Sequence, residues 1–108
     1  QAEYQAGRRE WNKRSKSGFD NAIKHYEKAI DLDPGYAQPY VGLADTFLMI
    51  PLYNFGKPDT MMPKVRIYAE KAIQINPDIA GAYTSLGMLM LQYEYNWTEA
   101  EKNFKKAL

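Results

Sequence analysis

The sequence predicts an all-α fold, a right-handed stack of helix pairs, and three observations support it. A short segment occurs twice and begins a third time, as AIKHYEKAIDLDP at 22–34, AEKAIQINP at 69–77 and AEKNFKKA at 100–107. Apolar residues ahead of the second and third copies recur with the period of an amphipathic helix. Aromatic residues make up 14% of the chain, unlike the aromatic-poor composition of disorder. A repeated unit that cannot bury its apolar face alone stacks on its neighbours.

Composition limits the classes of function. A chain of 108 residues fits one domain, residues 1–108, and can bury a core without cross-links. It has no cysteine, which excludes disulfides and thiolate metal sites. A net charge of +1 is too small to steer the molecule toward nucleic acid or acidic lipid. We favour a cytoplasmic location, and we expect a fragment of a longer protein because the chain stops at Leu108, inside the third unit.

The first helix pair is expected over about 3–34. Tyr4, Gly7 and Trp11 mark its first helix, and the turn at 12–15 precedes the second. Ser17, with an acidic residue three positions later, offers a weak capping box for that second helix. The helix should stop at Asp33-Pro34, because proline disfavours the α conformation in the residue before it.

The middle pair, about 37–77, is longer than the first, and we place this insertion between its helices, at 50–58. Tyr40, Leu43, Ala44 and Phe47 form one apolar stripe on its first helix. The second helix can be capped by Asp59 or Thr60, with Pro63 in its first turn, and it should end at Asn76-Pro77.

The third pair, about 80–108, is incomplete. Its first helix repeats the stripe with Tyr83, Leu86, Gly87 and Met90. Its second helix should begin with a capping box in which Thr98 is the N-cap and the glutamate three residues later completes it.

These positions resemble the tetratricopeptide repeat, a helix–turn–helix unit of about 34 residues. The pattern is the large aromatic, Leu-Gly or Leu-Ala, a second aromatic or Met, then the alanine-containing helix closed by proline. A finer likeness rests on Gly7-x-x-x-Trp11-Asn12-Lys13-Arg14, the long middle turn and Tyr95-Asn96-Trp97. It resembles repeat regions that follow winged-helix, adenylate cyclase or serine/threonine kinase domains in bacterial regulators. The resemblance implies a non-enzymatic protein–protein interaction module.

The resemblance also implies where a partner would bind, because the first helices of such units line a concave groove. Val41 and Asp45 stand where some family members carry Lys and Asn, so a clamp for a terminal carboxylate is not expected. A partner helix or extended peptide fits better, and the alternative is that the protein's own next helix fills the groove. The expected groove residues are Gln38, Val41, Asp45, Leu48, Met49, Thr84, Met88, Leu91 and Gln92.

The middle insertion carries large apolar side chains. Leu52, Tyr53 and Phe55 either fold back over the repeats or form an exposed patch for a partner.

Other functions find less support. His25 is the only histidine and is read as a surface or packing residue, so no metal, cofactor or catalytic group is expected. Nucleic acid is not a favoured partner, but a basic N-terminal face remains an alternative contact for it or for an acidic protein. The apolar C-terminal unit leaves self-association open as another alternative. The basic residues are Arg8, Arg9, Lys13, Arg14 and Lys16.

Overall fold

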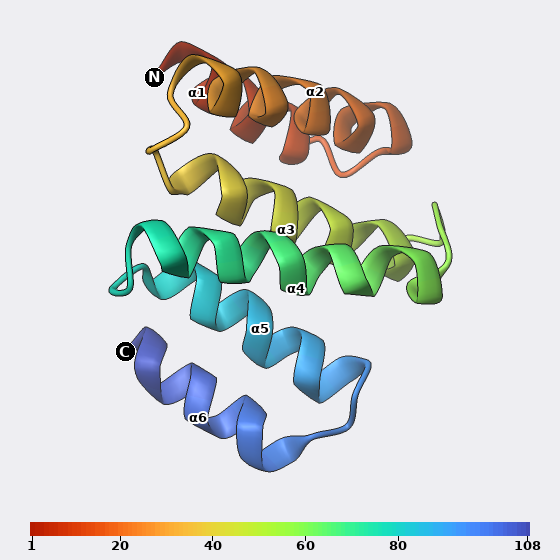
Figure 1. Ribbon diagram of the computed structural model, residues 1–108. Helices are drawn as coiled ribbons and strands as arrows, with labels where there is room; N and C mark the ends of the chain where they lie inside the picture. The colour runs from red at the N-terminus through yellow and green to blue at the C-terminus, as the bar shows by residue number, and fades with distance from the viewer.

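A computed structural model describes residues 1–108 as six α-helices without a strand. The helices form three antiparallel pairs that succeed one another along a stack, and each new pair packs on the one before (Figure 1). This confirms the predicted all-α repeat architecture. No helix is both long and apolar enough to cross a membrane. The pairs are α1 (Ala2–Trp11) with α2 (Lys16–Leu32), α3 (Gln38–Leu52) with α4 (Pro58–Ile75), and α5 (Ala80–Gln92) with α6 (Trp97–Ala107).

The ends of the second helices fall where the prolines predict. Helix α2 ends at Leu32 and α4 ends at Ile75, each one residue before the Asp-Pro or Asn-Pro pair. The residue before proline avoids the α region, and neither C-cap residue, Asp33 or Asn76, has helical backbone angles.

The predicted N-caps of the second helices are wrong by two to three residues. Ser15, not Ser17, caps α2, and its hydroxyl oxygen accepts the backbone N–H of Gly18 at 3.0 Å. Ser15 has the extended backbone that an N-cap requires, because the chain reverses at Arg14, whose φ is +50°. Asn96, not Thr98, caps α6 in the same way.

Helix α4 likewise begins earlier than expected. Its first residue is Pro58, preceded by Lys57 without a side-chain cap, so neither Asp59 nor Thr60 is the N-cap. Proline suits the first helical position because its missing N–H has no partner there. Pro63 consequently lies inside the helix and not in its first turn.

The middle insertion is partly helical. Helix α3 continues to Leu52, so only residues 53–57 connect it to α4, in place of the expected span 50–58. Ile50 is 5% exposed, and the longer helix buries it against the core.

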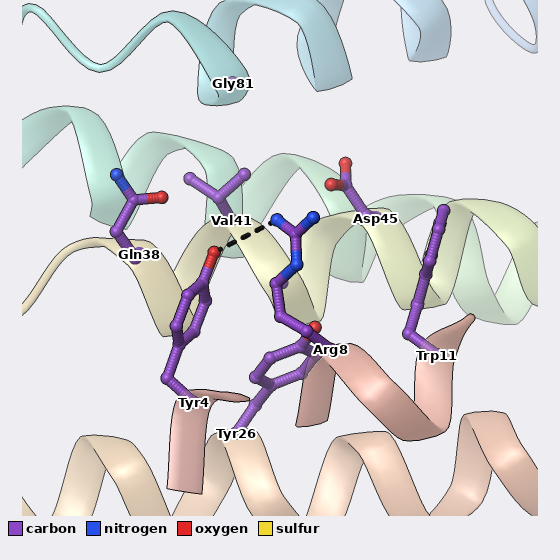
Figure 2. A pocket seen from close by; sticks show the side chains of 9 residues that line it. Tyr4, Arg8, Trp11, Tyr26, Gln38, Val41, Asp45 and Gly81 are labelled. Carbon is purple, nitrogen blue, oxygen red and sulfur yellow. Dashed lines mark hydrogen bonds between the residues drawn. The ribbon is translucent and has the colours of Figure 1, made fainter. Parts of the chain in front are cut away.

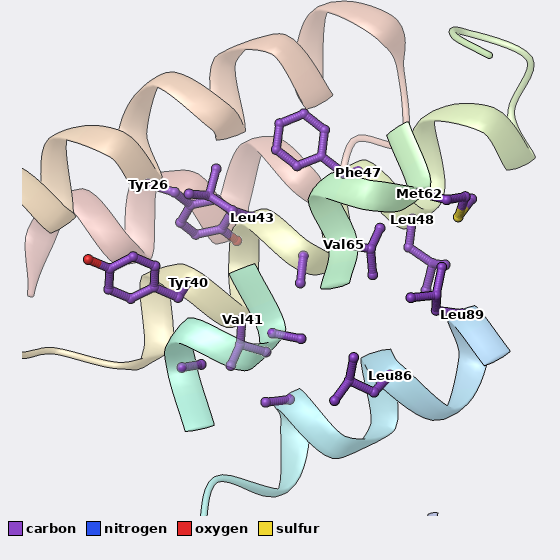
Figure 3. Packing of buried hydrophobic residues seen from close by; sticks show 14 of the residues in the cluster. Tyr26, Tyr40, Val41, Leu43, Phe47, Leu48, Met62, Val65, Leu86 and Leu89 are labelled. Carbon is purple, nitrogen blue, oxygen red and sulfur yellow. The ribbon is translucent and has the colours of Figure 1, made fainter. Parts of the chain in front are cut away.

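The predicted apolar stripe of α3 forms the centre of the core (Figure 3). Tyr40, Leu43, Ala44 and Phe47 are all buried, as predicted. The ring of Phe47 stacks on Tyr68 of α4, with 5.7 Å between centroids and 10° between planes.

Tyr26 of α2 is held between glycines of two neighbouring helices. It is 2% exposed, and a Cβ atom built on either Gly7 of α1 or Gly42 of α3 would lie 2.5 Å from its ring. Neither glycine therefore has room for a side chain. This close approach brings α1 against α3. It also positions the side chains that line the space between these two helices.

Candidate functional site

A pocket of about 250 Å³ lies between α1 and α3, with the start of α5 on its far rim (Figure 2). On α1 the lining side chains are spaced four and three residues apart, so they share one helical stripe. The α3 residues follow the same rule. The pocket is lined by Tyr4, Arg8, Trp11, Tyr26, Gln38, Val41, Gly42, Asp45 and Gly81.

Asp45 carries the negative charge of the pocket. Its Oδ1 accepts the hydroxyl of Ser85 from α5 at 2.6 Å. Burial raises the pKa of the Asp45 carboxyl from 3.8 to about 6, and the Ser85 hydrogen bond and the Arg8 charge lower it only in part. The group is therefore mostly ionised at neutral pH and still has unused acceptor positions.

Arg8 carries the positive charge. Its Nη1 donates to the phenolic oxygen of Tyr4 at 3.3 Å, and it forms no ion pair with any carboxylate. Figure 2 shows its guanidinium group between Tyr4 and Asp45. Because a guanidinium has five N–H donors, most of those of Arg8 are available to another molecule.

Trp11 forms one end of the pocket. Its ring packs edge-on against Phe19 at 6.5 Å, and the guanidinium of Arg14 lies over it at 5.4 Å. The indole Nε1–H is buried without a hydrogen-bond acceptor. An unpaired buried donor costs about 1–3 kcal/mol, so this wall of the pocket contains unused hydrogen-bonding capacity.

The structure brings together three of the five groove residues predicted on α3. Gln38, Val41 and Asp45 all line the pocket. Leu48 does not, because it is 3% exposed and packs in the core, so its assignment to an open groove is corrected. Met49 is half-buried against the same core.

The predicted groove residues of α5 do not join this pocket. Thr84 is exposed and donates its hydroxyl to the Ala80 carbonyl, and Met88 packs against the core. Leu91 lines a separate hollow beside α6, and Gln92 lines another near the end of α3. A ligand role for these residues stays a prediction.

Sequence reasoning missed the contribution of α1. Tyr4 and Trp11 were read only as markers of the repeat, and Arg8 only as part of a basic cluster. Their spacing, together with the expected adjacency of first helices, was the signal that could have placed them opposite Gln38 and Asp45.

The connection after α3 folds back onto the first pair. Tyr53 and Phe55 pack on the buried ring of Phe19 at 5.6 and 6.2 Å, and they stack on each other. Arg14 Nη1 donates to the Tyr53 hydroxyl at 3.4 Å. Leu52 remains 51% exposed. A partner contact at these residues stays a prediction.

Two further charged candidates, Lys13 and His25, have partners within the chain. Lys13 forms an ion pair with Glu10. The His25 Nδ1 atom lies 2.7 Å from the Glu3 carboxylate, which gives this histidine a packing role on the helix surface. No group of three or more acidic or histidine side chains is placed to hold a metal ion.

Comparison with known protein families finds a match for part of the chain. Residues 14–50, which include the end of the first turn, all of α2 and most of α3, match a family model described as TPR repeat. No curated protein matches the chain.

Proposed function

We propose that the chain is a stack of tetratricopeptide repeats, which generally mediate protein–protein interactions and are typically non-catalytic, and that it binds a partner peptide in the α1–α3 pocket. In this proposal it is the scaffold or sensing segment of a larger bacterial regulator. The observation that carries the proposal is the pair of opposite charges, Arg8 and Asp45, held in one pocket without pairing to each other.

The charges favour a neutral dipolar group as the ligand. A carboxylate entering the pocket would approach Asp45, and an ammonium group would approach Arg8, so either would meet repulsion. A carboxamide avoids both, because its N–H₂ can donate to Asp45 while its carbonyl accepts from Arg8. The group would be an asparagine or glutamine side chain, or an exposed backbone amide, of the partner.

The size and walls of the pocket agree with this ligand. Its volume of about 250 Å³ is below the roughly 300–1,000 Å³ of small-molecule sites, so it suits one side chain of a longer peptide. The rings of Tyr4 and Trp11 provide flat apolar walls on either side of the polar groups.

Selection of short random peptides displayed on phage tests the proposal. Selected peptides should share an asparagine or glutamine, and Arg8→Gln should weaken their binding about tenfold or more, since hydrogen bonds to charged groups contribute about 1.5–3 kcal/mol. Arg9→Gln is the matched control, because Arg9 is the neighbouring exposed arginine outside the pocket. Peptides that bind wild type and Arg8→Gln equally would refute the proposal.

The same variants distinguish peptide binding from the nucleic-acid alternative. Binding of nucleic acid to the basic N-terminal face should weaken steeply with salt, and should respond to Arg9→Gln as much as to Arg8→Gln.

A further inference from the structure

A second hollow, of about 460 Å³, lies between the second and third helix pairs, and we call it the turn hollow. The end of α3 and the start of α4 form one side of it, and the connection from α5 to α6 forms the other. Figure 1 shows the connections within the three pairs along one edge of the stack, opposite the two connections between pairs. The turn hollow shares no residue with the α1–α3 pocket. Its lining includes Pro51, Leu52, Asp59, Met62, Tyr93 and Tyr95.

Tyr95 has an unusual backbone conformation for an exposed tyrosine. Each connection within a pair contains one residue with positive φ, namely Arg14 at +50°, Asn54 at +62° and Tyr95 at +55°. Asparagine is enriched in this left-handed region, whereas a bulky aromatic residue is rare there. Tyr95 is also 72% exposed, so burial of its ring does not offset the strain. A strained residue that the fold does not require at its position is a candidate for contact with another molecule.

Asp59 gives the turn hollow a negative charge that no cation of the chain neutralises. Its Oδ1 accepts the hydroxyl of Tyr93 at 2.7 Å, which joins the start of α4 to the end of α5. Asp59 takes part in none of the ion pairs, not even with the nearby Lys57, whereas Glu94 is paired with Arg66. The Asp59 carboxylate therefore retains acceptor positions for a cation from another molecule.

The aromatic rings beside Asp59 favour one kind of cation. A guanidinium group can form two parallel hydrogen bonds with a carboxylate and can also stack on an aromatic ring. The turn hollow offers both contacts, because Asp59, Tyr93 and Tyr95 all line it. An ammonium group is a compact, strongly hydrated charge and gains less from the rings. An anion would be repelled by Asp59.

The turn hollow has room for more than the guanidinium group. Its volume of about 460 Å³ exceeds the roughly 250 Å³ of the α1–α3 pocket, which suits a single side chain. The α3 and α4 side also contributes Pro51, Leu52 and Met62, and Leu52 is 51% exposed. An apolar residue next to the arginine would cover this wall and remove Leu52 from water.

We propose that the turn hollow binds an arginine side chain of a partner protein, together with the apolar residue that follows it. The guanidinium group pairs with Asp59 and stacks on Tyr95, and the apolar residue lies against Leu52. The unneutralised charge of Asp59 determines that the occupant is cationic, and the rings determine that it is arginine.

A titration with short peptides tests the proposal. The probe is acetyl-Gly-Arg-Leu-Gly-amide, and the control peptides carry lysine or citrulline in place of arginine; citrulline has the shape of arginine without its charge. In ¹⁵N–¹H spectra, the backbone signals of residues 92–95 should move with the arginine peptide. Its Kd should be lower than that of the citrulline peptide by about fivefold or more, since a hydrogen bond to a charged group is the stronger kind. Equal Kd values for the arginine peptide and either control, or movement with none of them, would overturn the proposal.

Variants of the two contact residues complete the test. Asp59→Asn should raise the Kd of the arginine peptide about fivefold or more. Asp78→Asn is the matched control and should leave the Kd unchanged, because Asp78 is an exposed carboxylate in the α4–α5 connection, at the opposite edge of the stack (Figure 1). Tyr95→Asn should raise the Kd about threefold and also raise Tm, because asparagine suits the left-handed backbone. An unchanged Kd in Asp59→Asn or Tyr95→Asn would overturn the proposal, as would a lower Tm in Tyr95→Asn, which would make Tyr95 a residue that the fold requires.

Discussion

The contact of Tyr26 with Gly42 offers a double-mutant test of how the repeats pack. In Gly42→Ala, the new methyl group would lie 2.5 Å from the Tyr26 ring, well inside van der Waals contact. Overpacking of this kind costs about 1–3 kcal/mol. The better helix propensity of alanine returns about 1 kcal/mol, so we expect a net loss of stability of up to about 2 kcal/mol.

The same substitution should change sign once the ring is removed. Tyr26→Ala alone should cost about 3–5 kcal/mol, because it deletes a fully buried aromatic side chain. In that background Gly42→Ala meets no ring and should stabilise the protein by up to about 1 kcal/mol. The coupling energy between the two positions is then about 1–3 kcal/mol, the overpacking cost itself.

Urea unfolding of the four proteins, followed by far-ultraviolet circular dichroism, measures this coupling. Gly35→Ala serves as the control, because a Cβ at Gly35 would meet no atom closer than 3.8 Å. If Gly42→Ala has the same effect with and without the Tyr26 ring, the reasoning about close approach is wrong.

Three further predictions follow from single sites. The folded-state pKa of Asp45, about 6, lies above its ordinary 3.8, so folding favours the protonated form. Urea melts should therefore show wild type losing stability relative to Asp45→Asn, by at most about 3 kcal/mol, between about pH 4 and pH 7; parallel curves would contradict this. Phe55→Ala should cost about 1–2 kcal/mol because the ring packs on the first pair, whereas the exposed Leu52→Ala should stay within about 0.5 kcal/mol in the same assay. Asn96→Ala should lower thermal stability by about 1 kcal/mol and Thr98→Ala by less than about 0.5, and the reverse order would reinstate Thr98 as the cap.

The helices and their ends were predictable because their signals are local. Proline acts on the residue directly before it, so the stops at Leu32 and Ile75 follow from the sequence alone. The starts of the second helices were not predictable in the same way. At α2, for example, two suitable N-cap residues, Ser15 and Ser17, lie two positions apart. The choice depends on the backbone reversal at Arg14, which no propensity indicates.

The candidate site was predictable only in part, for a different reason. Helical spacing shows which residues share a stripe, but the packing of neighbouring helices decides which of them stay open. Leu48 has the right spacing for a groove and is nevertheless buried in the core. Arg8 and Trp11 line the pocket because Tyr26 and its two glycines bring α1 against α3. This is a tertiary effect, and the sequence pattern of a single helix does not predict it.

The proposed function predicts which of two surfaces a partner peptide touches, and the two tryptophans report on them separately. Trp11 lies in the α1–α3 pocket and Trp97 in the hollow beside α6. The most direct measurement is a ¹⁵N–¹H spectrum of the two indole N–H groups during titration with a peptide selected by phage display. We predict that the Trp11 signal moves, as its unpaired N–H changes environment, while the Trp97 signal stays in place. Movement of Trp97 with an unchanged Trp11 signal would contradict the assignment of the pocket as the binding site.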